Sequence, residues 1–381
     1  MWHSSGVFAP WSSPNGLLTF GMRLIHVALG ARSYPIHIGS GLLPRLGVEC
    51  RAVALGTRCA VITDSHVAPR FAPPALASLR NAGFDPMLVT IPAGETSKSL
   101  RVVHHCYDQL AGHRLERKSF VVALGGGVVG DLAGFVAATY LRGLAFVQVP
   151  TTLLAQVDSS VGGKVGVNLK AGKNLVGAFH QPRFVLCDLD TLKTLPAREY
   201  RSGLAEVIKY GIIYDEALFR KLERQMPKLL HLDRAALTAI VARCCEIKAE
   251  VVAKDETETG QRAILNFGHT IGHAIEAISG YNRFLHGEAI SIGQVAAARL
   301  SVQCSGLSSA AVGRIRRLFE AAGLPTTIRL SSSQRTRLFN SMKLDKKVNA
   351  GEITFVLAEQ IGRVRWGQRV PETAVREALH S

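Results

Sequence analysis

A regular alternation of apolar strands and helices, running from Met22 to about Leu195, is the feature that most constrains the fold. Strands are expected at 22–29, 59–64, 86–91, 119–124, 146–150 and 184–188, with helices at 75–82, 100–111 and 131–140. Apolar strands that alternate with helices form a mostly parallel sheet covered on both faces. The first half of the chain is therefore predicted to be an α/β domain.

The pattern changes near Leu195, and only helices are expected after it. They are predicted at 198–211, 215–225, 234–255, 269–278, 288–305 and 310–322. At 381 residues the chain is long enough for two domains, so we expect an α/β domain at 22–195 and an all-α domain at 196–381. Residues 1–21 contain no Asp or Glu and continue neither pattern, which predicts a disordered extension.

Composition excludes several classes of protein. A hydrophobic content of 47% is too high for a disordered chain. The most apolar region, 119–150, is interrupted by a glycine run, Asp131 and Arg142, so no membrane span is expected. The seven cysteines form no C-x-x-C pair and their number is odd, which favours free thiols in a reducing cytoplasm.

The net charge of +16 could indicate nucleic-acid binding. The lysines and arginines are scattered, however, without a basic tract or interleaved aromatic residues, so this role is not favoured. Between residues 132 and 187, five Lys or Arg residues accompany a single acid, Asp158. That imbalance within an apolar stretch indicates a pocket for a small multianionic ligand.

A glycine-rich turn, Gly125 to Gly130, follows the strand expected at 119–124 and fits the pattern G-x-G-x-x-G. Glycines let backbone N–H groups approach phosphates, and the next helix N-terminus favours negative charge. The acid usually found about 20 residues later is missing, because Gln148 stands there. The turn is either part of a variant nucleotide-binding fold or an ordinary tight turn. Asp64, at the end of an earlier strand, could hold ribose hydroxyls instead.

The segment 150–164, followed by Lys173 and Asn174, is rich in polar groups against a background of small residues. Its lysines could pair with phosphate or carboxylate groups of a ligand, and Gly162 and Gly163 would let the backbone come close. A solvated loop is the alternative, although the segment carries few charges for an exposed loop.

Histidines and one glutamate give the strongest indication of chemistry. His269 and His273 are four residues apart, on one face of an expected helix, and His286 follows. Glu206, on the first helix of the second half, could complete a His/His/Glu zinc site, with Lys209 on the same face. Solvated or core histidines are the alternative, and spacing alone leaves open which histidines bind metal.

Four motifs together resemble the 3-dehydroquinate synthase family, within the sugar-phosphate cyclase superfamily. They are LGGGVVGD at 124–131, PTTLLAQVDSSVGGK at 150–164, AEVIKYG at 205–211 and NFGHTIGHAIE at 266–276. The likeness extends from about Met22 to beyond Lys347. It implies a Rossmann-like NAD-binding domain followed by an all-α metal-binding domain, a homodimer, and a small anionic sugar-phosphate substrate. It also implies NAD and Zn²⁺ or Co²⁺ as cofactors.

The resemblance also assigns residues. The metal ligands it implies are Glu206, His269 and His286, which leaves His273 as a substrate-side acid/base or hydrogen-bonding group. The substrate residues it implies are Arg142, Asp158, Lys164, Asn174, Lys209, Lys248, Arg262, Asn266, His273 and Lys346. The NAD residues it implies are Asp64, Ala93, Gly94, Glu95, Thr96, Ser97, Lys98, Gly127, Val128, Val129, Gly130, Asp131, Thr151, Thr152, Lys164, Lys173, Thr191, Leu192, Lys193 and Thr194.

The implied reaction converts 3-deoxy-arabino-heptulosonate 7-phosphate into 3-dehydroquinate and phosphate, with NAD used and regenerated. Two other enzymes would share this fold and these cofactors: a related sugar-phosphate cyclase, and a metal-dependent polyol dehydrogenase. Net NADH production would separate the dehydrogenase from a synthase, which makes none.

Overall fold

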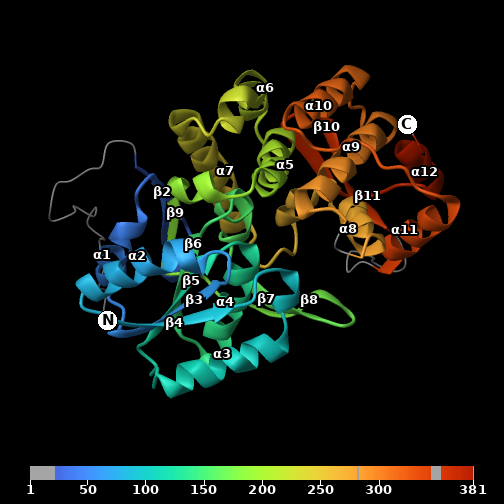
Figure 1. The fold of residues 1–381 in the computed structure, drawn as a ribbon. Coiled ribbons are helices and arrows are strands. Elements are labelled where there is room, and N and C mark those ends of the chain that lie inside the picture. The colour runs from blue at the N-terminus through green and yellow to red at the C-terminus, as the bar shows by residue number, and fades with distance from the viewer. Residues whose placement is uncertain (1–21, 281–282, 345–352, 381) are drawn as a thin grey trace, which may run out of the picture.

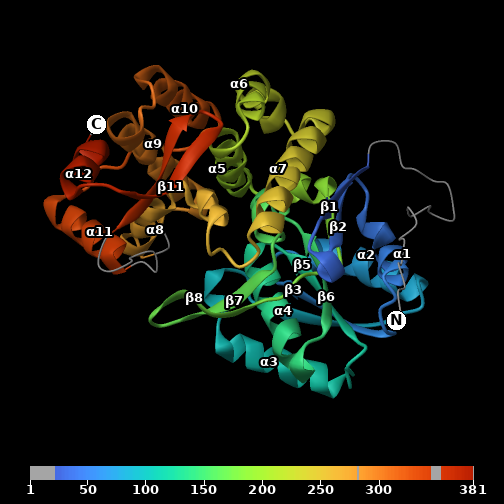
Figure 2. The ribbon, with the colours of Figure 1, turned by 180° about the vertical axis from the view of Figure 1, so that it is seen from behind.

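The computed structural model describes residues 22–280, 283–344 and 353–380 (Figures 1 and 2). The predicted extension at 1–21 and Lys346 lie outside the described residues. An α/β part and a largely helical part lie side by side, with the α/β part holding the first half of the chain. The predicted fold class, a mostly parallel sheet followed by a helical half, is confirmed.

A seven-stranded sheet forms the centre of the α/β part, in the order β1-β2-β9-β6-β5-β3-β4. Its strands are β1 (Arg23–Val27), β2 (Tyr34–Gly39), β3 (Arg58–Asp64), β4 (Asp85–Ile91), β5 (Phe120–Gly125), β6 (Ala145–Pro150) and β9 (Val185–Asp188). All neighbouring strands are parallel except β1 and β2, which form an antiparallel edge. Strand β2 was not predicted from the sequence.

Helices cover both faces of the sheet because its central strands are apolar on both sides. In β3, Cys59 and Val61 face α1 (Leu46–Ala52) and α2 (Ala68–Asn81). The alternate residues Ala60 and Ile62 face α3 (Leu100–Gly112) and α4 (Gly127–Thr139). Successive side chains of a strand point to opposite faces, so a fully apolar strand requires two helical layers.

The strand order reverses between β3 and β5. From β3 the chain moves outward to β4, returns to the other side of β3 as β5, and continues to β6. In open parallel sheets, ligands bind outside the carboxyl ends of the strands at such a reversal. The turns after β3, β4, β5, β6 and β9 all open on this edge, which makes it the expected position of a ligand.

An antiparallel hairpin, β7 (Lys164–Leu169) and β8 (Gly172–Phe179), carries the polar segment that follows β6. It packs on α4 through Val165 and Val167 and projects beneath α8 in Figure 1. The sequence did not predict these two strands.

The second half begins with α5 (Ala197–Ile213), α6 (Glu216–Leu230) and α7 (Arg234–Lys254). It continues with α8 (His269–Ile278), α9 (His286–Ser305), α10 (Ser309–Ala321), α11 (Ser332–Leu344) and α12 (Glu372–His380). The expectation of helices alone missed an antiparallel hairpin, β10 (Thr354–Gln360) and β11 (Arg363–Arg369). Among the described residues, no helix is both long and apolar enough to cross a membrane.

One hydrophobic core runs across residue 195. It contains Val27 and Ile36 from the sheet together with Leu204 from α5 and Ile240 and Val251 from α7. This core joins residues on both sides of the boundary that was predicted near Leu195. The boundary itself remains a prediction.

Candidate metal and cofactor site

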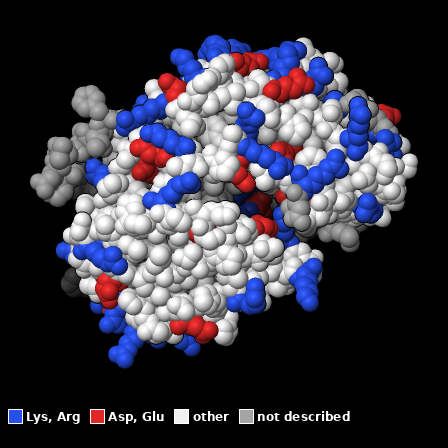
Figure 3. Space-filling view, in the orientation of Figure 1, with Lys and Arg blue, Asp and Glu red and all other residues white. Residues whose placement is uncertain are grey.

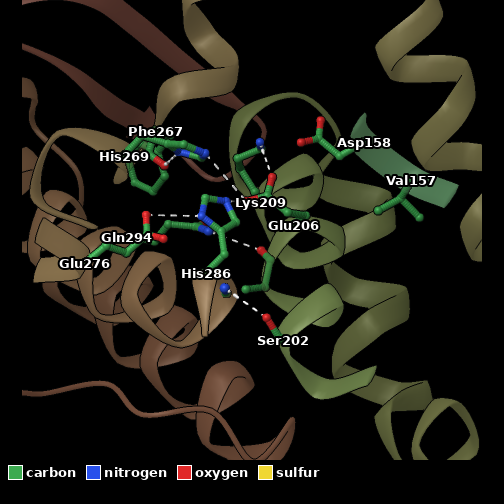
Figure 4. A network of polar contacts seen from close by, with 12 residues as sticks. Val157, Asp158, Ser202, Glu206, Lys209, Phe267, His269, Glu276, His286 and Gln294 are labelled. Carbon is green, nitrogen blue, oxygen red and sulfur yellow. Dashed lines mark hydrogen bonds and ion pairs between the residues drawn. The ribbon is translucent and has the colours of Figure 1, made fainter. Parts of the chain in front are cut away.

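Three helices bring the predicted metal ligands together (Figure 4). Glu206 comes from the middle of α5, His269 is the first residue of α8, and His286 is the first residue of α9. The Nε2 atoms of His269 and His286 lie 3.6 and 3.7 Å from Glu206 Oε1. Ligand atoms of the three side chains all lie within 4.8 Å of one another.

Two glycines allow these helices to approach. Gly268, with φ +77, precedes α8, and a Cβ there would lie 2.5 Å from the backbone nitrogen of Gln294 in α9. A Cβ on Gly287 would lie 1.9 Å from the carbonyl oxygen of Ser202 in α5. Any side chain at either position would force the helices apart, and the ligand atoms with them.

The chemistry of the three side chains suits a divalent metal. Glu206 is fully buried, and its Oε1 has no hydrogen-bond partner. A buried carboxylate oxygen without a partner is costly unless a cation or donor meets it. His269 Nδ1 lies 3.1 Å from the carbonyl oxygen of Phe267, which leaves Nε2 facing Glu206. One carboxylate and two imidazoles match a catalytic zinc site that keeps a position open for substrate.

A lysine and a histidine also border this group. Lys209, 1% exposed, lies one turn beyond Glu206 and pairs with its carboxylate. Burial would lower the pKa of Lys209, but the carboxylates of Glu206 and Asp158 outweigh it and raise that pKa. His273 faces the same space, with its ring centroid 5.2 Å from that of His269 and 6.0 Å from that of His286.

Glu276 supports His286 from the other side. Its Oε2 lies 3.3 Å from His286 Nδ1, and its Oε1 lies 3.3 Å from the Lys173 ammonium. Burial would raise the pKa of Glu276, but the hydrogen bond and charge of His286 and the charge of Lys173 lower it to about 2. The pKa of His286 is raised, because Glu276 outweighs the effect of burial. Sequence reasoning did not identify Glu276, since a glutamate on a helix usually faces solvent.

A chain of charged contacts leads from the metal group toward β7. Lys248 of α7 pairs with Asp158, and the Tyr210 hydroxyl donates to Asp158 Oδ1 at 3.2 Å. Burial would raise the pKa of Asp158, but the ammonium groups of Lys248 and Lys209 lower it well below its usual range. Burial is the main reason why the pKa of Lys248 is lowered.

The next contacts involve the Glu258 carboxylate and two backbone carbonyls, none of which was predicted. Lys164 pairs with Glu258, whose Oε1 also accepts a hydrogen bond from Asn266 Nδ2 at 2.8 Å. The Arg262 guanidinium donates to the backbone carbonyls of Glu256 and Gly162. Carboxylates thus hold Lys164 and Lys248, whereas backbone carbonyls hold Arg262. Figure 3 shows both signs of charge in the recess between the two parts of the molecule.

The predicted NAD residues other than Lys164 and Lys173, which lie on the β7–β8 hairpin, gather at the carboxyl edge of the seven-stranded sheet. Asp64 ends β3, residues 93–98 follow β4, residues 127–131 follow β5, Thr151 and Thr152 follow β6, and residues 191–194 follow β9. The start of α4 has no side-chain cap, so its first N–H groups are open to a phosphate. This edge therefore fits a dinucleotide, although the individual assignments remain predictions.

Contacts at this edge show what Gln148, which stands where an acid was expected, and Asp64 do in the fold. Gln148 is buried against the glycine turn, where a Cβ on Gly130 would lie 2.9 Å from its Oε1, so it packs as part of the core. Asp64 Oδ1 accepts hydrogen bonds from the backbone N–H groups of His66 and Val67, at 2.8 and 3.0 Å. Asp64 therefore also stabilises its own turn.

The hairpin contributes to the same edge. Lys98 Nζ donates to Asp131 Oδ2 and to Asn174 Oδ1, both at 2.6 Å. Asn168, which sequence reasoning missed, donates to Glu95 Oε1 at 2.8 Å and accepts from the Asn174 backbone N–H at 2.9 Å. Asn168 thus connects residues from both predicted sets.

Arg142, a predicted substrate residue, lies away from the metal group and the carboxyl edge of the sheet. It is exposed and precedes β6, at the edge of the sheet opposite Thr151. Lys193 is also largely exposed and pairs with Asp190 at 2.7 Å.

Comparison with known proteins identifies the family. The model of the 3-dehydroquinate synthase N-terminal region matches residues 88–202, and that of the C-terminal region matches residues 203–348. The chain is 51% identical over 358 residues to the 3-dehydroquinate synthase of Desulforamulus reducens, covering 94% of this chain and 99% of that one.

Solved structures of two other cyclases have the same fold as this chain. The 2-epi-5-epi-valiolone synthase ValA of Streptomyces hygroscopicus subsp. jinggangensis 5008, with NAD⁺ and Zn²⁺ bound, is 28% identical with a TM-score of 0.82, over 92% of this chain and 97% of that one. A 2-deoxy-scyllo-inosose synthase complexed with carbaglucose-6-phosphate, NAD⁺ and Co²⁺ is 26% identical with a TM-score of 0.81, over 94% of this chain and 99% of that one. The chain therefore belongs to the 3-dehydroquinate synthase family.

Proposed function

We propose that the protein is a 3-dehydroquinate synthase of the shikimate pathway, which serves aromatic amino acid biosynthesis. It converts 3-deoxy-arabino-heptulosonate 7-phosphate into 3-dehydroquinate and phosphate, as a carbon–oxygen lyase. One observation carries the proposal: the Glu206, His269 and His286 group adjoins buried lysines and an arginine that can meet an anionic sugar phosphate. A relative 51% identical over nearly its whole length bears the same name.

Two cofactors follow from the site and from the related cyclases. Glu206, His269 and His286 would hold Zn²⁺ or Co²⁺, and the carboxyl edge of the sheet would hold NAD. When bound, the metal would polarise alcohol and ketone oxygens of the substrate, and NAD would accept and return a hydride.

The residues of the chain bind and orient the substrate. Lys164, Lys248, Arg262 and Asn266 supply donors for its carboxylate, phosphate and hydroxyl groups. The Glu258 carboxylate pairs with Lys164 and accepts from Asn266, so it holds these two proposed substrate donors near each other. Asp158 remains ionised at neutral pH and keeps the Lys248 ammonium in place.

His273 is the residue proposed to hold or transfer a proton near the metal. Its ring lies beside those of His269 and His286, and it is not one of the three proposed ligands. Glu206 and Lys209 beside this space are buried, which strengthens the electrostatic interaction between them.

Three wider features belong to the same proposal. We infer a homodimer from the family resemblance, and a reducing cytoplasm from seven cysteines that are all free. The predicted division of the chain at residue 195 into an NAD-binding part and a metal-binding part is retained as a proposal.

The test follows phosphate release from the heptulosonate phosphate together with NADH absorbance, with and without NAD and zinc. Phosphate release without net NADH, abolished by a chelator, would support the synthase. Steady NADH formation on a polyol would instead identify a dehydrogenase. His269→Ala should lose bound metal and phosphate release together.

A further inference from the structure

Glu276 occupies an unusual position for a residue outside the proposed substrate and metal sets. It lies on α8 and is 6% exposed, yet its carboxylate contacts both parts of the molecule. One oxygen faces His286 of α9 and the other faces Lys173 of β8, each at 3.3 Å. Figure 4 shows Glu276 and Glu206 on opposite sides of the His286 ring.

A role as a second metal ligand is one explanation. Atoms of His273, Glu276 and His286 also lie within 4.8 Å of one another. A neutral imidazole, however, has one nitrogen lone pair to offer and a proton on its other nitrogen. If His286 presents Nε2 to the first metal group, its Nδ1 carries the proton and cannot bind a second ion. The Lys173 ammonium beside Glu276 would also repel a second cation.

We propose that Glu276 is a positioning residue for the metal group. It accepts a hydrogen bond from His286 Nδ1–H, so the lone pair of Nε2 faces Glu206, and it anchors Lys173 with its other oxygen. A carboxylate behind a ligating histidine fixes the tautomer and the ring orientation and makes the ring a stronger ligand. The inference rests on the proposed function only in requiring that a divalent metal occupies the Glu206 group.

The first experiment measures zinc affinity and stoichiometry by competition with a chromogenic chelator. Loss of such a partner typically weakens metal binding about 10- to 100-fold. Glu276→Gln keeps an acceptor without its charge, so its affinity should fall about tenfold, and Glu276→Ala should fall toward a hundredfold. The wild type should bind one ion per chain. Glu250→Gln removes one carboxylate from α7 and should leave the affinity unchanged.

A second measurement reads the His286 tautomer in metal-free protein by long-range ¹H–¹⁵N NMR. At a pH where the His286 ring is neutral, the wild type should be the Nδ1–H form, whereas Glu276→Ala should shift toward the Nε2–H form. Lys173→Met should not weaken zinc binding, because the carboxylate remains. If Glu276→Ala does not fold, Glu276→Gln and the wild-type tautomer still decide the matter.

Clear results would overturn the inference. Unchanged zinc affinity in Glu276→Gln, or an Nε2–H tautomer in the wild type, would exclude a positioning role. Two ions per wild-type chain and one in Glu276→Gln would make Glu276 a ligand. None of these measurements requires substrate turnover, so a failure here is distinct from a failure of the proposed reaction.

Discussion

Lys209 and the metal are expected to neutralise the same buried carboxylate. The Lys209 and Glu206 side chains are 1% and 0% exposed, and Oε1 of Glu206 faces the two histidines. Replacing Lys209 with Met would leave that carboxylate without its ammonium partner. Breaking a buried pair in this way costs about 3–5 kcal/mol, which corresponds to a fall in thermal midpoint of about 5 °C for 381 residues that unfold together.

Zinc should reverse much of this loss. The ion would replace the missing ammonium as the counter-charge of Glu206. A ligand that binds the native state and not the unfolded state stabilises the native state, by about 4 kcal/mol when its concentration is a thousand times its Kd. The increase in thermal midpoint on adding zinc should therefore be larger in Lys209→Met than in the wild type.

Differential scanning calorimetry of chelator-treated protein, with and without zinc, measures both quantities. Lys228→Met, an exposed lysine on α6, is the matched control and should behave as the wild type in both conditions. Equal midpoints for wild type and Lys209→Met without metal, or an equal zinc response, would refute the idea that the two cations share one carboxylate.

Three further predictions concern other parts of the site and the thiols. Lys164→Ala should keep bound zinc and lose phosphate release. Its free energy of unfolding should fall by less than about 1 kcal/mol, because the Lys164–Glu258 ion pair is partly exposed. Full activity of this variant would exclude a substrate role for Lys164. Asn168→Ala removes two hydrogen bonds and should raise the NAD Kd about tenfold without changing zinc affinity, as calorimetric titrations of both ligands would measure. In native protein at pH 8 only Cys304, the exposed cysteine, should react with a thiol reagent, because the other six are buried and burial raises the pKa of Cys59 and Cys106 to about 12. All seven thiols should react after unfolding. Several reactive thiols in the native protein would contradict this prediction.

The sequence predicted helices and buried strands well where the apolar pattern was strong. The helix at 269–278 has the predicted bounds, because its apolar residues recur with a helical period. The helix α2 starts at Ala68, seven residues earlier than predicted, because Pro73 and Pro74 lie within it and prolines usually indicate a helix start or end. The hairpins were missed because glycines or charged residues obscure the strand alternation.

In the candidate site, too, some residues were predicted from the sequence and others were missed. Glu206, His269 and His286 came from motifs, and the structure places them together. Glu276 ends the motif at 266–276, but its contacts with His286 and Lys173 cannot be derived from that motif, and Asn168 lies in no recognisable spacing. Their positions depend on how α8, α9 and the β7–β8 hairpin pack, which is long-range information that no local pattern contains.

The hydrophobic core shared by the sheet and helices α5–α7 has a consequence for cooperativity. A fragment ending at residue 195 would expose Val27 and Ile36 to water, and the complementary fragment would expose apolar side chains of α5 and α7 such as Leu204 and Ile240. Neither fragment could bury its apolar face without the other. We therefore expect unfolding to propagate across residue 195 as one event, so that loss of structure on either side removes cofactor edge and metal group together.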